Sequence, residues 1–396
     1  MKPRRILVTD GTQRSALAVV RSLGRSGHTV FVCSTRVPSL AGASRFSFAE
    51  SIVPDPLVSP VDFATEVTLL VDRWRIDTLI PIAEASLLAL LPERATVGAT
   101  IPFPDERIVR AVMDKGAVLA AARELGIATP RQVVLASKND LLAMDPTQLD
   151  YPVVLKPSRS VGEHDGRRVA VGVLHVADAA SLRPLVESLD DAAFPLLIQQ
   201  RIIGPGTGVF LLVWDGVVRA TFAHRRLREK PPSGGVSVYS ESIAADPELV
   251  EKSRLLLEGM RWNGVAMVEY KLDARTGVPY LMEVNGRFWG SLQLAIDAGV
   301  DFPALLIAAA SGEPMAPVTE YRRGARSRWW WGDVDQLLAR WRRSDESLAL
   351  PSDAPSRARA TLDFFSLMHP HNRSDVFRAR DMRPFIRETL DWFRRR

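Results

Sequence analysis

Residues 268–291 read VEYKLDARTGVPYLMEVNGRFWGS and place Glu269 and Glu283 in segments that otherwise have the composition of buried strands. The strand-like segments GVAMVEYKL and VPYLMEVNG flank DARTG, whose residues favour a turn, so the pair predicts a β-hairpin. Cross-strand partners in an antiparallel hairpin have a constant sum of residue numbers. A turn centred on Thr276 therefore places Glu269 opposite Glu283.

The two facing carboxylates need a positive charge between them. On a hairpin such a pair costs a few tenths to about 1 kcal/mol, and more where it is buried. The period of two along a strand adds Asn285 and Arg287 to the face of Glu283. One interpretation is an ion cluster in which Lys271 or Arg287 supplies the charge. The other is a divalent cation, because Mg²⁺ binds carboxylate and amide oxygens and completes its shell with water and substrate phosphates.

A nucleotide site would also require phosphate-binding groups upstream. Lys156 ends the apolar segment YPVVLKP, and the loop SRSVGEHDG after it can offer backbone N–H groups to phosphate oxygens. Lys115 begins a helical stretch in MDKGAVL, and the apolar segment LLIQQRIIG offers a strand edge to a base. Each feature is common by itself, as an exposed lysine, a surface loop or an ordinary buried strand. Their combination is what favours a nucleotide.

In this order the motifs resemble the ATP-grasp superfamily of ligases, which includes biotin carboxylase, carbamoyl-phosphate synthetase and the D-alanine and dipeptide ligases. The resemblance covers residues 105–317 and is most specific in MEVNGR. It implies an ATP- and Mg²⁺-dependent carboxylate-amine ligase that forms an acylphosphate and releases ADP. Two alternatives stay open: phosphoryl transfer to a non-carboxylate acceptor, and nucleotide binding without turnover.

The resemblance also implies roles for individual residues. The ATP-binding set is Lys115, Lys156, Ser158, Ser160, Gly162, Gln199, Gln200, Arg201 and Ile202. The set for one or two Mg²⁺ ions, which Mn²⁺ can replace, is Glu269, Glu283 and Asn285. Arg287 would meet the transferred phosphoryl group or its acceptor. The chain departs from the family at the hinge, where many members carry a glutamate and this chain has Gln199 and Gln200, and in the Glu163-His164-Asp165 run of the glycine loop.

A basic segment, AHRRLREKPPSGG, follows the hinge. Its cations, Arg225, Arg226, Arg228 and Lys230, suit an anionic substrate, and Arg226 and Lys230 are the predicted catalytic members. PPSGG is predicted to be a mobile lid, because an acylphosphate hydrolyses unless water is excluded. The competing interpretation is a solvated basic loop.

The remaining organisation follows from composition and periodicity. With 396 residues, 46% of them hydrophobic, the chain can form more than one core. Alternating strand-like and helix-like segments in residues 1–104 predict a parallel α/β domain, and DGTQRSA lacks the later glycines of a dinucleotide fingerprint. An ATP-grasp domain of α+β type is predicted for 105–317, and a helical, basic and tryptophan-rich extension for 318–396.

The single cysteine, Cys33, and the lack of a signal sequence or a long apolar run predict a soluble cytoplasmic protein. The expected partners are small-molecule carboxylate and amine substrates, with no nucleic acid and no membrane span; a homo-oligomer stays open. The arginine clusters of the extension fit a solvated helix face, although such clusters also occur in nucleic-acid binders. In RSRWWWGD at least one tryptophan is expected to face a partner, a substrate or a second subunit.

Overall fold

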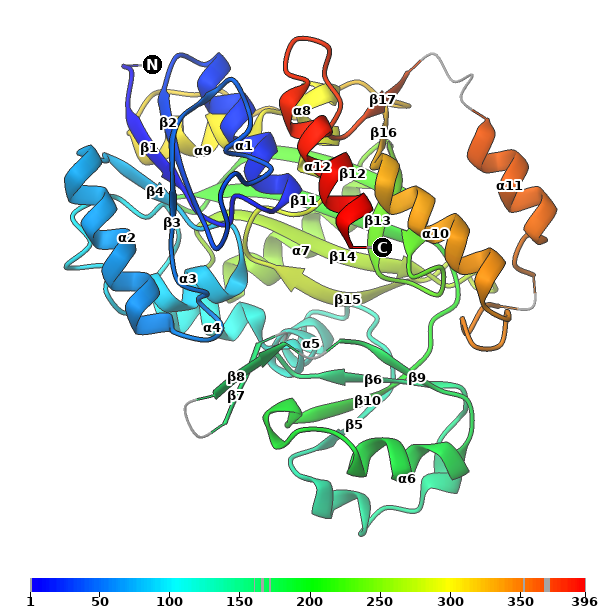
Figure 1. Ribbon diagram of the computed structural model, residues 1–396. Coiled ribbons are helices and arrows are strands. Elements are labelled where there is room, and N and C mark those ends of the chain that lie inside the picture. The colour runs from blue at the N-terminus through cyan, green and yellow to red at the C-terminus, as the bar shows by residue number, and fades with distance from the viewer. Residues whose placement is uncertain are drawn as a thin grey trace.

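A computed structural model describes residues 2–159, 161–164, 167–170, 172–351, 353–366 and 371–395. The N-terminal part is a parallel α/β layer (Figure 1), as the alternation of segments predicts. Its sheet has the order β3-β2-β1-β4, formed by β1 Arg5–Val8, β2 Thr29–Ser34, β3 Ser47–Ile52 and β4 Thr78–Ile80. Its helices are α1 Arg14–Arg25, α2 Pro60–Trp74 and α3 Glu84–Leu90. Cys33 lies in β2 and is fully buried.

Two helices connect this layer to the rest of the chain, and the second begins at Lys115, as the sequence predicts. They are α4 Glu106–Met113 and α5 Lys115–Glu124. The break is at Asp114, which has an extended backbone and accepts a hydrogen bond from Ala117 N through its side chain. Asp114 is thus the N-cap of α5 and places Lys115 in the first turn of that helix.

A small antiparallel sheet follows, with the order β5-β10-β6-β9. Its strands are β5 Gln132–Leu135, β6 Val153–Pro157, β9 Leu174–Val176 and β10 Leu196–Gln200, covered by α6 Ala179–Glu187 and the short helices η1 Lys138–Leu141, η2 Pro146–Gln148 and η3 Asp191–Ala193. Its apolar residues form a core separate from the main one. The predicted glycine loop includes a two-stranded hairpin, β7 Val161–His164 and β8 Arg167–Ala170. In Figure 1 the small sheet and its helices lie below the main body.

The main body is built on a seven-stranded sheet with the order β15-β14-β11-β12-β13-β16-β17. Its long strands are β11 Gly206–Trp214, β12 Val217–Lys230, β13 Val236–Ser242, β14 Gly264–Leu272 and β15 Pro279–Asn285. The accompanying helices are α7 Pro247–Gly259, α8 Leu292–Ala298 and α9 Phe302–Ala310. One continuous hydrophobic core joins this sheet to the N-terminal layer.

The C-terminal extension is helical, as predicted, with α10 Trp330–Arg342, α11 Arg357–Phe365 and α12 Arg383–Arg394. It also adds two short strands to the main sheet, β16 Arg326–Arg328 and β17 Asn372–Ser374. The three tryptophans all contact this chain. Trp329 donates to Glu388, Trp330 packs on Phe364, and Trp331 stacks on Trp392.

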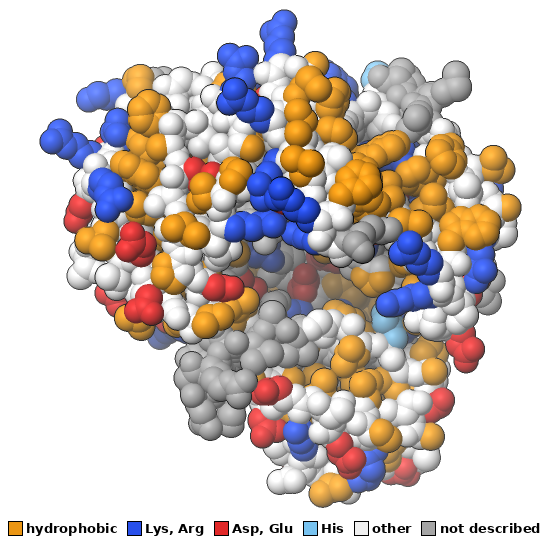
Figure 2. Space-filling view, in the orientation of Figure 1, with side chains coloured by type: hydrophobic (Ala, Val, Ile, Leu, Met, Phe, Trp, Pro, Cys, Tyr) orange, Lys and Arg blue, Asp and Glu red, His pale blue; other side chains and the backbone are white. Residues whose placement is uncertain are grey.

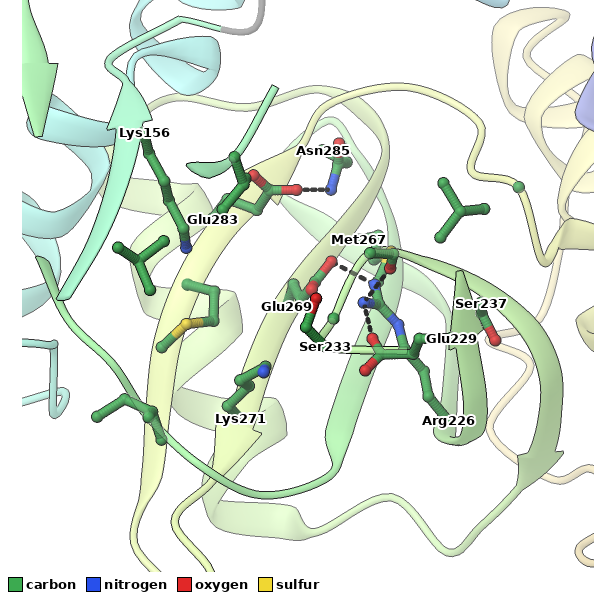
Figure 3. Close-up of a pocket in the computed structure, with 18 of the residues that line it drawn as sticks. Lys156, Arg226, Glu229, Ser233, Ser237, Met267, Glu269, Lys271, Glu283 and Asn285 are labelled. Carbon is green, nitrogen blue, oxygen red and sulfur yellow. Dashed lines mark hydrogen bonds and ion pairs between the residues drawn. The ribbon is translucent and has the colours of Figure 1, made fainter. Parts of the chain in front are cut away.

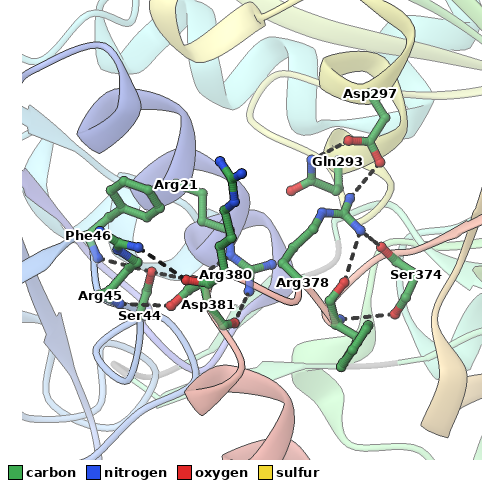
Figure 4. Close-up of polar contacts among 11 residues, drawn as sticks. Arg21, Ser44, Arg45, Phe46, Gln293, Asp297, Ser374, Arg378, Arg380 and Asp381 are labelled. Atoms are coloured by element: carbon green, nitrogen blue, oxygen red, sulfur yellow. Dashed lines mark hydrogen bonds and ion pairs between the residues drawn. The ribbon is translucent and has the colours of Figure 1, made fainter.

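Arginine–aspartate pairs hold the extension against the rest of the molecule (Figure 4). Buried Arg21 of α1 donates to Asp381 at 2.8 Å, and the same carboxylate accepts from Ser44 and from Arg45 N. Arg378 pairs with Asp297 near the end of α8 at 2.5 Å. Ion pairs as well as apolar contacts therefore link the extension to the N-terminal layer and to α8.

Among the described residues, no single helix is long and apolar enough to cross a bilayer. The helices α8 and α9 reach the required length and hydropathy only as a pair, and they are bent by 89° relative to each other.

Candidate active site

A cavity of about 320 Å³ lies between the small sheet and the main sheet. Figure 2 shows the hollow between the large upper body and the smaller lower part, with blue Lys and Arg side chains along its upper rim. Strands β6 and β10 supply one wall, and β12, β14 and β15 supply the other. The site is therefore assembled from segments distant in the sequence.

The hairpin pairing predicted from residues 268–291 is confirmed, because Glu269 lies opposite Glu283. The turn, however, is centred between Arg275 and Thr276, since Leu272 pairs with Pro279. A bulge at Met282 shifts the register by one residue and brings Glu283 opposite Glu269. Met282 and Glu283 both line the cavity.

The predicted polar face is present beside this pair. Asn285 donates through Nδ2 to Glu283 at 3.0 Å, and Arg287 donates to Asn285 Oδ1 at 3.3 Å. Lysine and arginine side chains also supply the charge that the two acids require, but they are Lys115 and Arg226. Lys115 Nζ lies 3.4 Å from Glu283, and Arg226 donates to Glu269 at 2.5 Å.

These cations control the ionisation of the two glutamates. Burial opposes the ionisation of Glu283, but Lys115 and Lys156 outweigh it and lower its pKa to about 2. Burial raises the pKa of Glu269, and Arg226 opposes that shift. Burial also lowers the pKa of Lys156, against the pull of Glu283 and Glu269. Figure 3 shows Lys156 pointing from the small sheet toward Glu283.

Of the residues predicted to contact phosphates, the two lysines line cavities, and the others lie elsewhere or are not described. Lys156, in β6, lines the main cavity, and Lys115 lines a smaller cavity beside it. Ser158 Oγ donates to Asp114 at 2.7 Å and Ser158 O accepts from Lys115 N at 2.8 Å, so this serine holds β6 against α5. Gly162 pairs with Val169 in the hairpin, and Ser160 lies outside the described residues, as does Asp165 of the predicted acidic run.

The predicted hinge residues Gln199, Gln200, Arg201 and Ile202 all line the cavity. Gln199 is buried and donates to Gln132 at 2.8 Å. Arg201 donates to the carbonyl of Ala349, so the hinge contacts the C-terminal extension. These contacts hold in place the end of β10, whose edge is predicted to bind the base of the nucleotide.

The two predicted catalytic residues of the basic segment, Arg226 and Lys230, have different surroundings. Arg226 is 9% exposed at its side chain and bridges Glu229 at 2.8 Å and Glu269 at 2.5 Å, facing the cavity (Figure 3). Burial alone would lower the pKa of Arg226, but Glu269 and Glu229 together raise it. Lys230 pairs instead with Asp335 of α10 and does not line the cavity. The predicted lid forms the β12–β13 turn, and its residues 233–235 line the cavity.

Glu84, at the start of α3, is a site residue that was not predicted from the sequence. This glutamate lines the smaller cavity together with Lys115, Glu283, Asn285 and Arg287. Burial raises its pKa, against Arg287 and Lys115. Among the described residues, its Oε1 atom is buried without a hydrogen-bond partner. A glutamate at a helix start in IPIAEAS is ordinary in sequence, and only the tertiary fold places it at the site.

Comparisons with known proteins find a matching family and similar folds. Residues 193–331 match the family described as "ATP-grasp in the biosynthetic pathway with Ter operon". The L-amino acid ligase from Bacillus licheniformis superimposes with a TM-score of 0.60 at 17% identity, over 78% of this chain and 74% of that one. A biotin carboxylase complex from Campylobacter jejuni gives 0.64 at 16% identity, over 82% and 74%.

The chain has an ATP-grasp fold. That fold confirms the resemblance inferred from the motifs and the predicted fold class. In sequence, the chain is 34% identical to the D-alanine–D-alanine ligase of Pseudomonas putida strain GB-1 over 110 residues, which cover 26% of this chain and 31% of that ligase. The chain spans less than two thirds of the length of the curated relatives it matches.

Proposed function

We propose that this protein is an ATP- and Mg²⁺-dependent ligase that joins a carboxylate to an amine through an acylphosphate and releases ADP and phosphate. The observation that carries the proposal is the convergence on one cavity of Lys156, Glu269, Glu283, Asn285 and Arg287. The similarity to ligases, and the Campylobacter jejuni complex with β-γ-ATP, support it. The expected substrates are small molecules. Three further properties stay predictions: the cytoplasmic location, the oligomeric state and the domain boundaries.

The residues fit magnesium. The described residues contain no cluster of three His, Cys, Asp or Glu side chains, as a closed protein metal site would have. Glu269, Glu283 and Asn285 instead supply two carboxylates and an amide oxygen from adjacent strands, which is the set that Mg²⁺ uses when phosphates and water complete its shell. When bound, the metal would neutralise phosphate charge during phosphoryl transfer.

The chain's own groups perform the remaining tasks. Lys115 and Lys156 would bind phosphate oxygens from the α5 and β6 sides of the site, and Lys115 would exchange its present ion pair with Glu283 for this contact. Arg287 is positioned by Asn285 and by the carbonyl of Phe288, so its guanidinium can stabilise charge on the transferred phosphoryl group or on the oxyanion that follows. The β12–β13 turn would exclude water from the acylphosphate.

Glu84 supplies the negative charge that an amine substrate requires. Its carboxylate reaches the site from the N-terminal layer, on the side of Arg287 and Lys115. An ammonium group there would give Oε1 the hydrogen-bond partner that it lacks among the described residues. The ammonium must lose a proton to become a nucleophile, and Glu84 is the carboxylate that lines the smaller cavity besides Glu283.

The test is ADP release with Mg²⁺ and ATP across a panel of carboxylates, with and without amines, with products identified by mass spectrometry. The ligase predicts strict dependence on both substrates and a product mass equal to their condensation. ADP formation with a stable phosphorylated product and no need for amine would show a phosphotransferase instead. ATP binding without ADP under any pairing would show a nucleotide-binding protein.

A matched pair of variants tests the site. Glu283→Gln should abolish turnover while the protein stays folded, because one metal-binding carboxylate is lost. Glu251→Gln, at an exposed position of α7, is the control and should leave turnover unchanged. Normal turnover in Glu283→Gln would contradict the metal assignment.

A further inference from the structure

A second, larger cavity of about 590 Å³ lies behind the β12–β13 hairpin. Its walls are β12, β13, α10, α11 and the residues Leu350, Pro351 and 353–355, so the C-terminal extension builds much of it. It shares Arg226 and Glu229 with the active-site cavity, and Pro232 of the hairpin turn lies on its side. The two cavities are therefore neighbours, separated by one hairpin.

Arginines outnumber carboxylates around this second cavity. Buried Glu241 accepts from both Arg225 and Arg326, at 2.6 Å and 2.8 Å. Fully buried Asp333 accepts from two further arginines, Arg228 and Arg328, at 2.5 Å each. Within this group four guanidinium groups share two carboxylates. The cavity lining itself carries four arginines, Arg226, Arg228, Arg326 and Arg340, against three acids, Glu229, Asp353 and Asp363. Guanidinium groups that share a carboxylate repel each other, and an anion would relieve the repulsion.

Two of these arginines, Arg228 and Arg326, line the second cavity, while Glu241 and Asp333 do not. Tyr239 lies between them, with the Arg228 guanidinium 4.5 Å and that of Arg326 6.0 Å from its ring centre. Each side chain is thus held from behind by a buried carboxylate and from the side by an aromatic ring. Their orientation is set before any ligand arrives.

Another arginine of the cavity wall, Arg340 of α10, is only 3% exposed. One of its nitrogens donates to the carbonyl of Pro355, and Asp345 is 3.9 Å from another. Among the described residues its Nε atom is buried and has no hydrogen-bond partner. A buried charge with an unused donor is costly unless a ligand completes it.

We propose that the second cavity binds the anionic, carboxylate-bearing end of a substrate whose reacting group lies in the active-site cavity. This inference rests on the proposed ligase function and specifies its substrate class. The acids that also line the cavity are Glu229, which is paired with Arg226, and Asp353 and Asp363, of which Asp363 is paired with Arg359. The ligand would therefore bind on the side of Arg228, Arg326 and Arg340.

The first measurement is direct binding of citrate, a tricarboxylate probe, by calorimetry on the full chain without ATP. Arg340→Gln should weaken citrate binding about tenfold or more, since a hydrogen bond to a charged group contributes about 1.5–3 kcal/mol. Asp363→Asn removes a repelling charge at a half-buried position of α11 and should strengthen binding a few-fold, which keeps the test valid if Arg340→Gln is unstable. Arg275→Gln, on the exposed hairpin turn, is the control and should not change binding.

The second measurement compares substrates that differ only in the distal charge, such as L-glutamate against L-glutamine, in the ADP-release assay. The wild type should favour the acid about tenfold or more, and Arg340→Gln should lose that preference. Citrate binding that depends on Arg340 in a protein without ADP release would support the anion site and refute the ligase. ADP release with equal use of acid and amide, and citrate binding absent or unchanged by Arg340→Gln and Asp363→Asn, would overturn the inference alone.

Discussion

Arg226→Gln is expected to lower the free energy of unfolding of the protein. The Arg226 guanidinium bridges Glu229 and Glu269, and its side chain is 9% exposed, against 14% and 12% for the two acids. Glutamine keeps some of the length and polarity but removes the charge. Two nearly buried carboxylates, with Glu283 opposite one of them, would then lack their common cation.

Removing one partner of a buried ion pair typically costs about 3–5 kcal/mol, because the remaining charge is left uncompensated. We expect about 3 kcal/mol at pH 8, since Lys115 and Lys156 still lie near Glu283 and limit the loss. The effect should shrink as the pH falls. Burial already raises the pKa of Glu269, so in the variant this acid takes up a proton more readily in the folded state than in the unfolded state.

The assay is urea unfolding of the wild type, Arg226→Gln, Glu269→Gln and the double variant, followed by tryptophan fluorescence at pH 8 and pH 5. The double variant should be more stable than Arg226→Gln, because it no longer leaves the Glu269 charge unpaired. A cost below about 1 kcal/mol, or strict additivity of the two single changes at both pH values, would refute the role of Arg226 as the shared counter-charge.

Three further changes probe the nucleotide site, the extension and the hinge. Lys156→Met should raise the KM for ATP about tenfold to hundredfold in the ADP-release assay, since a charged hydrogen bond contributes about 1.5–3 kcal/mol; an unchanged KM would argue against phosphate contact. Burial raises the pKa of Glu388 to about 7, above its ordinary 4.5, so ionisation destabilises the fold at high pH. Glu388→Gln should therefore raise the free energy of unfolding by about 1–2 kcal/mol at pH 8.5, with no gain below pH 4.5, as two urea titrations would show. At Gly204 (φ +152°) an added Cβ would lie 1.7 Å from the carbonyl oxygen of Leu272, so Gly204→Ala should lower the melting temperature by several degrees, and equal melting curves would contradict the clash.

The acidic hairpin could be predicted from sequence because the period of a strand fixes which side chains share a face. The pairing of Glu269 with Glu283 followed from that period and from the position of the turn. The bulge at Met282 could not be predicted, because a single unpaired residue leaves no mark in an apolar segment. The predicted pairing is therefore correct, although the predicted turn centre lies half a residue from the observed one.

The partners of the acids were less accessible to sequence reasoning. Lys271 and Arg287 are near in sequence, but the contacting cations come from α5 and β12. Within β12, register shifts on either side of Arg228 interrupt the alternation that would assign Arg226, Arg228 and Lys230 to one face. As a result Arg226 meets Glu269, while the other two pair with aspartates of α10.

The extension was the least predictable part of the chain. Strands β16 and β17 have three residues each and mostly polar side chains, so neither apolar periodicity nor propensity marks them. They form because β13 presents an edge and the extension crosses it. The same crossing gives Trp329, Trp330 and Trp331 partners inside the chain, where the sequence suggested an external one.

Because Cys33 is buried, a cysteine introduced elsewhere can be labelled selectively to follow motion at the site. Cys33 is the single cysteine of the chain and is fully buried in β2, where burial raises the pKa of its thiol and keeps it unreactive. A cysteine introduced at Ser233, on the β12–β13 turn, would therefore be labelled selectively in an otherwise native background. A fluorophore or spin label at that one position would report directly whether nucleotide closes the turn over the cavity.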